Sequence, residues 1–162
     1  MSWWSGHGGT MAVERISFLV PHPPKALRPN RRAAHWATRA KAADEYSEVV
    51  VDQAYFVSIW PKPELDTAIV THRKTLPWER ARVTYTWRYA GVAPDIDNIA
   101  GALKCLQDTL CVAPPPNKRS KDKRNRWYLG LIENDSGIEA TFKREKVKHK
   151  ADEGVLVEVA RL

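Results

Sequence analysis

Cysteine and long apolar runs are both scarce in this chain. Its 162 residues include two cysteines, Cys105 and Cys111, whose number and spacing match neither a zinc site nor a disulfide framework. We therefore expect free thiols and a reducing, cytoplasmic setting. No segment approaches the ~18 apolar residues of a membrane-spanning helix, and the first residues lack the basic and apolar parts of a signal peptide. The sequence thus predicts a protein without membrane contact.

Positive charge is abundant. Lys plus Arg number 26 against 19 for Asp plus Glu, which gives a formal net charge of +7. Such an excess favours a polyanionic partner, although a basic protein without one has the same composition. The chain is long enough for one domain with its own core. We predict a flexible tail over residues 1–12, where glycines gather, and a single domain over 13–162.

The apolar pattern predicts strands and two helices. The expected strands span 13–20, 68–70, 81–90, 137–147 and 154–161, and the expected helices span 36–56 and 97–110. One face of the first helix should carry Trp36, Ala40, Ala43, Tyr46, Val50 and Ala54. Prolines make 21–35 an extended loop, and a charged turn near Gly154 joins the last two strands. This order predicts an α+β fold, a small mixed sheet with helices packed on it.

Acidic residues gather at the start of the second helix. Asp95 and Asp97 lie one residue apart, and helical spacing places Lys104 and Asp108 on the face of Asp97. The opposite stripe is apolar and consists of Ile99, Ala102, Leu103, Leu106 and Leu110. Carboxylates at this spacing suit Mg²⁺, which can orient a water against a phosphodiester. A nearby lysine can balance the negative charge of the transition state.

The same residues also have ordinary structural readings. Asp95 or Asp97 can be helix N-caps, and Lys104 and Asp108 can be a surface pair. Segment 131–136 offers further carboxylates, Glu133 and Asp135, ahead of a predicted strand, and by itself it reads as an acidic turn.

Three segments in this order resemble the RusA family of Holliday junction resolvases. The first runs from Pro21-His22-Pro23-Pro24 through Pro29-Asn30-Arg31 to His35-Trp36. The second is Asp95-Ile96-Asp97-Asn98, followed by Lys104, Asp108 and Leu110. The third is Glu133-Asn134-Asp135-Ser136. Together they cover nearly the whole chain, from about residue 13 to 160.

The resemblance implies a RusA-like fold and a homodimeric endonuclease that uses Mg²⁺, or Mn²⁺ in its place, on branched DNA. It also implies a bacterial or phage-encoded protein. Asp95, Asp97 and Asp135 then become the metal ligands and Lys104 the catalytic lysine. Three features depart from the family. Gly101 stands where some members have the lysine, and Asn134 stands where a second acid is common, which leaves Glu133 open as a ligand. Residues 112–130 resemble an insertion.

Two basic clusters account for much of the charge. The residues that we expect to bind DNA are Arg28, Arg31, Arg32 and His35 in the first, and Lys118, Arg119, Lys121, Lys123, Arg124 and Arg126 in the second. They should neutralise phosphates rather than read bases. Trp127 or Tyr128 could stack on an unpaired base. The second cluster can instead be a solvated loop, and His35 and Trp36 can simply pack at a helix start. Another metal nuclease, or a non-catalytic DNA-binding module, remains an alternative function.

Overall fold

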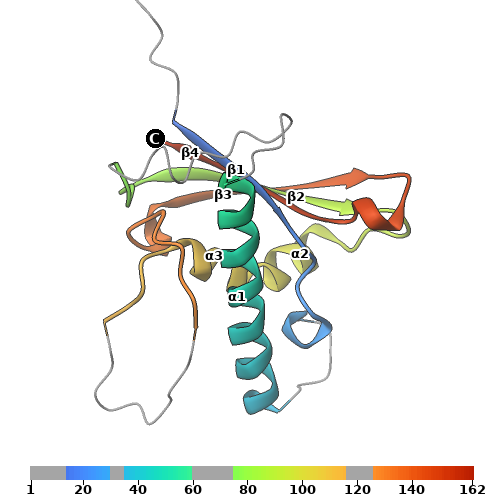
Figure 1. Ribbon diagram of the computed structural model, residues 1–162. Coiled ribbons are helices and arrows are strands. Elements are labelled where there is room, and N and C mark those ends of the chain that lie inside the picture. Colours follow the sequence, from blue (N-terminus) through green and yellow to red (C-terminus); the bar gives the residue numbers. More distant parts are fainter. Residues whose placement is uncertain (1–13, 30–34, 60–74, 116–125) are drawn as a thin grey trace, which may run out of the picture.

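The computed structural model describes residues 14–29, 35–59, 75–115 and 126–162, and its centre is a four-stranded sheet (Figure 1). The strands are β1 (Arg15–Val20), β2 (Ala81–Tyr89), β3 (Ile138–Lys146) and β4 (Gly154–Arg161), in the spatial order β1-β4-β2-β3. β4 runs antiparallel to both of its neighbours, whereas β3 runs parallel to β2. The sheet is therefore mixed, and the α+β class that the sequence predicts is confirmed.

The last two strands are not neighbours in the sheet. β4 lies between β1 and β2, so the charged turn before Gly154 carries the chain across β2. Side-chain chemistry explains the order. Val155, Val157 and Val159 are fully buried, as a central strand requires, whereas β3 has mostly exposed, charged side chains. Charged residues along an edge strand discourage pairing with another chain, so β3 suits the edge.

Three helices cover one face of the sheet (Figure 1). They are α1 (Trp36–Ile59), α2 (Ile96–Ala102) and α3 (Lys104–Leu110). Between them and the sheet lies one core, built from alternate residues of the strands such as Phe18, Val83 and Val157. On the other face of the sheet the structure describes no helix. No described helix is long and apolar enough to span a membrane.

Some predicted boundaries need correction. The helix expected over 97–110 is two helices that meet at Leu103, where φ is −88° and ψ is 2°. The apolar stripe is nevertheless confirmed, because all five of its residues are buried. Trp36 does not belong to the buried face of α1, since 67% of its surface is exposed. The loop over 21–35 contains one turn of 3₁₀ helix, η1 (Lys25–Leu27). The tail over 1–12 and the strand over 68–70 lie outside the described residues.

Candidate functional site

Lys104 joins two segments that are distant in the sequence. Its Nζ lies 3.0 Å from Asp108 Oδ1, one turn along α3, and 3.2 Å from Asp135 Oδ2. Asp135 opens the short 3₁₀ helix η2 (Asp135–Gly137), immediately before β3. All three side chains keep substantial contact with solvent. The structure thus brings together two acids and one lysine of the predicted constellation.

The two carboxylates keep Lys104 protonated. The hydrogen bond to Asp108 is the largest cause of its raised pKa; burial opposes the shift, and the bond to Asp135 adds to it. An ammonium group of this kind donates hydrogen bonds and carries positive charge at neutral pH. It can therefore balance charge on an anionic group, and it is poorly suited to accept a proton.

The turn that contains Asp135 is fixed by its neighbours. Asn134 Oδ1 accepts a hydrogen bond of 3.1 Å from the backbone N–H of Ser136, and the Ser136 hydroxyl also bonds to it. A Cβ on Gly137 would lie 2.1 Å from the backbone oxygen of Glu79, so only glycine fits there. Asn134 therefore caps η2.

Glu133 is fixed through its backbone, because its N–H donates a hydrogen bond of 3.0 Å to the oxygen of Trp78. Its side chain is exposed, and the described residues give it no hydrogen bond or ion pair with Lys104. Asp135 is the residue of this turn that reaches the lysine.

Asp95 and Asp97 lie at the other end of the helical segment. Asp95 is the N-cap of α2, but in the described chain its carboxylate makes no capping hydrogen bond, and only its backbone oxygen accepts from Ile99. Asp97 lies in the first turn, and both side chains are exposed. Asp97 and Lys104 lie in different helices, which meet at Leu103. Within the part of the chain that the structure describes, neither carboxylate forms an ion pair.

The structure does not join all the predicted ligands into one cluster. Within 14–29, 35–59, 75–115 and 126–162, no three His, Cys, Asp or Glu side chains form a group that could hold a metal ion. The donor chemistry nevertheless fits Mg²⁺, because this ion binds through one or two carboxylates and keeps several waters. Asp95 and Asp97, with exposed oxygens one residue apart, are such a pair.

Packing explains the glycine at position 101, where some members of the RusA family have a lysine. A Cβ at this position would lie 2.8 Å from Cγ of Pro29, in the loop before α1. A longer side chain would collide with the ring. The proline-rich loop therefore leaves no room for a lysine at position 101, and Lys104 is the lysine that the helix offers.

The Tyr85 hydroxyl and the Cys111 thiol, both affected by the charge of Asp108, are buried in the core. The Tyr85 hydroxyl is buried and has no hydrogen-bond partner among the described residues, and burial raises its pKa, with Asp108 contributing. Burial also raises the pKa of Cys111 to about 11, and Asp108 and Asp135 add to the shift. The thiol therefore stays protonated at neutral pH and is not a nucleophile. The sequence analysis allowed Lys104 and Asp108 to form a surface ion pair, and the structure confirms that pair.

The described residues of the first basic cluster, Arg28 and His35, make contacts within the protein. The Arg28 guanidinium lies 5.8 Å from the ring centroid of Trp87, and His22 stacks on the same ring at 4.1 Å between centroids. His35 Nδ1 accepts a hydrogen bond of 3.3 Å from the N–H of Ala37, at the start of α1. Arg31, Arg32, Lys118, Arg119, Lys121, Lys123 and Arg124 lie outside the described residues.

Segment 126–128 is anchored to α1. Arg126 Nε lies 3.6 Å from Asp44 Oδ1, and the two side chains are only 16% and 24% exposed. The N–H of Trp127 donates a hydrogen bond of 3.0 Å to the hydroxyl of buried Ser47, while 51% of the Trp127 surface stays exposed. Arg126 is therefore committed to the fold, and Trp127 keeps a free surface.

No protein-family model matches this chain, and no curated protein matches it either. Its function is therefore inferred from its own residues. These are two exposed aspartates at the start of α2 and a protonated lysine held between Asp108 and Asp135.

Proposed function

We propose that this protein is a metal-dependent endodeoxyribonuclease of the RusA type, which resolves Holliday junctions by paired, symmetric cuts. The observation that carries the proposal is the position of Lys104 between Asp108 and Asp135. Because residues 31 apart meet at one charged group, the second and third segments of the RusA-like pattern lie at one surface. The resemblance of the whole pattern supplies the substrate class.

Each residue then has a role that its surroundings permit. Asp95 and Asp97 would hold Mg²⁺, or Mn²⁺ in its place, and Asp135 would join them as a ligand by leaving Lys104. When bound, the ion would polarise the phosphodiester and activate a water molecule. Lys104 contributes a fixed positive charge for the phosphoryl oxygens. Asp108 retains Lys104 at the surface when Asp135 turns to the metal, since it is the nearer of the two partners.

The partner and the assembly follow from the reaction. Two symmetric cuts in a four-way junction require two matched sites, which a two-fold homodimer provides. The net charge of +7 supports binding to a polyanion. Trp36 and Trp127, both large and exposed, are available to stack on unpaired bases.

The test is cleavage of a labelled four-way junction with Mg²⁺ or with EDTA. Wild type is compared with Asp97→Asn and with Asp152→Asn, a control at an exposed aspartate far along the chain in η3 (Lys150–Asp152). We expect paired nicks that need Mg²⁺, disappear in the Asp97 variant and persist in the control. Junction binding should persist in both variants.

Two outcomes would replace the proposal. Binding without nicking by the wild type would indicate a non-catalytic DNA-binding module. Nicking of linear duplex at the same rate as the junction would indicate another class of metal nuclease.

A further inference from the structure

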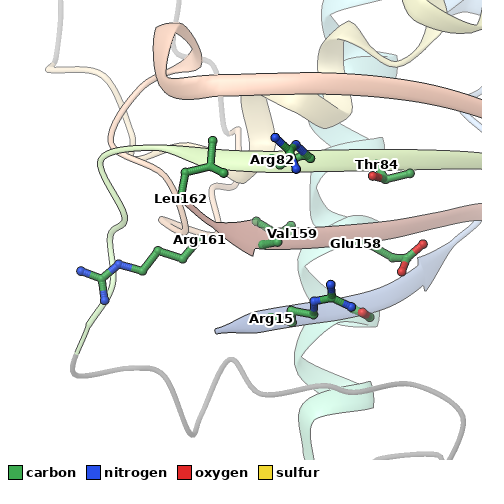
Figure 2. A pocket seen from close by; sticks show the side chains of 9 residues that line it. Arg15, Arg82, Thr84, Glu158, Val159, Arg161 and Leu162 are labelled. Atoms are coloured by element: carbon green, nitrogen blue, oxygen red, sulfur yellow. The ribbon is translucent and has the colours of Figure 1, made fainter. Parts of the chain in front are cut away.

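The helix-free face of the sheet contains a hollow of about 250 Å³ over β1, β4 and β2 (Figure 2). Strand register explains it. Ala160 of β4 pairs with Arg15 on one side and with Arg82 on the other, so two long side chains flank one methyl group. In the next row Glu158 lies between Ser17 and Thr84. Ala160 and Glu158 of the central strand thus form the floor, and the neighbouring strands contribute guanidinium and hydroxyl groups.

Positive charge in the hollow is only partly neutralised. Arg15 makes no ion pair with any described residue. Arg82 Nη2 lies 3.3 Å from Glu139 Oε2, but Glu139 also pairs with Arg80 at 3.0 Å, so one carboxylate serves two guanidinium groups. Glu158 forms no ion pair within the described part of the chain. Arginine therefore exceeds the acid that is engaged with it.

Arg161, which also lines the hollow, is occupied elsewhere. Its side chain extends away past the end of the sheet in Figure 2, and its Nη1 lies 3.1 Å from Glu14 Oε2. Arg15 and Arg82 remain as the two cations that the strand register places on either side of Ala160 in β4. Their backbones are two strand spacings apart, roughly 10 Å, a span that two arginine side chains close around one tetrahedral anion.

We propose that this hollow is a phosphate-binding site, with Arg15 and Arg82 as the clamp and the hydroxyls of Ser17 and Thr84 as further donors. The phosphate group that we expect it to bind belongs to the DNA backbone. The site is distinct from the acidic one, because Lys104 belongs to a helix on the opposite face of the sheet (Figure 1). It gives a branched substrate a second contact, and it does not depend on the chain being a nuclease.

The test measures binding of the full chain to a fluorescein-labelled four-way junction in EDTA, over a range of salt concentrations. Arg15→Ala should lower affinity about tenfold and reduce the slope of log K against log salt by about one. Lys150→Ala is the matched control, since it removes one charge from an exposed lysine outside the hollow, and it should change affinity little.

Two further variants separate a site from general charge. Ala160→Leu fills the floor without changing any charge, so it should lower affinity as Arg15→Ala does. Glu158→Gln removes the one acid in the hollow and should raise affinity several-fold, an effect that damage to the fold would not produce. Circular dichroism and melting temperature confirm that each variant is folded.

Inorganic phosphate, titrated against the labelled junction, distinguishes the sources. Competition that vanishes in Arg15→Ala shows a site for free phosphate as well as DNA, whereas weak competition with the same variant pattern shows a site for the DNA backbone. Equal effects of Arg15→Ala and Lys150→Ala, with no gain from Glu158→Gln, would overturn the proposal. So would a monomer–dimer equilibrium that shifts in Ala160→Leu while DNA affinity stays constant, because the face would then bind a second copy. Neither the binding assay nor the competition assay measures cleavage, so the phosphate-site proposal is tested independently of the nuclease proposal.

Discussion

The acidic site and the helix-free face have opposite charge ratios. At the acidic site one cation, Lys104, lies between two carboxylates. On the helix-free face one carboxylate, Glu139, lies between Arg80 and Arg82. A local excess of acid favours a cation as ligand, and a local excess of arginine favours an anion. Two ion-pair clusters of three residues each thus suit different ligands, because one has an excess of acid and the other an excess of arginine.

The largest expected effect comes from removing the one cation of the acidic site. Lys104→Ala should lower junction cleavage by about 10²–10³-fold, because a fixed charge no longer balances the phosphoryl oxygens. Single-turnover cleavage with saturating enzyme measures the rate, and Lys150→Ala serves as the control. A rate within twofold of wild type would show that Lys104 is only a surface partner of the two acids.

The turn beneath Asp135 should tolerate no added side chain. Gly137→Ala should lower the free energy of unfolding by about 3 kcal/mol, since its Cβ would overlap the backbone oxygen of Glu79. Urea denaturation measures the change. Gly91→Ala is the control, because a Cβ at that turn meets nothing within 4 Å. Equal stability of the two variants would mean that the turn is not held against residue 79.

A bound cation should relieve the excess of acid. Adding Mg²⁺ at about 100 times its dissociation constant should stabilise the fold by about 2.7 kcal/mol and raise the melting temperature by several degrees. The increase should be smaller in Asp97→Asn, measured by differential scanning fluorimetry against EDTA. A higher melting temperature in EDTA would argue against a shared metal site.

Asp108 should act through Lys104. Asp108→Asn should slow cleavage about tenfold by loosening the lysine, and it should have little further effect when Lys104 is already alanine. The double-mutant cycle, measured as cleavage rates, tests this dependence. Additive losses would give Asp108 a separate role.

The smallest expected effect is on stability, from replacing Glu139, which pairs with two arginines on the helix-free face. Glu139→Gln should change the free energy of unfolding by no more than about 1 kcal/mol, because exposed ion pairs contribute little. It should nevertheless raise affinity for DNA by leaving both arginines unpaired. Unchanged affinity over a salt series would show that the charge ratio of this face does not govern binding.

Local patterns predicted much of the fold and part of the candidate site. The stripe from Ile99 to Leu110 and the alternation in β2 identified the buried faces, because helical and strand periods are properties of neighbouring residues. The break at Leu103 was missed, since the same apolar stripe runs through it. The exposed position of Trp36 was also missed, because α1 begins beyond the part of the core that its face covers.

The sequence by itself determined the α+β class, the inward faces of helices and strands, and the acids and lysine that share one helix face. Only the tertiary structure decided that β4 enters between β1 and β2, that Asp135 meets Lys104, and that Arg15 and Arg82 flank Ala160. The physical reason is the distance along the chain over which each kind of interaction acts. Periodicity comes from backbone geometry within a few residues, whereas strand order and register minimise the free energy of contacts between residues far apart in the chain.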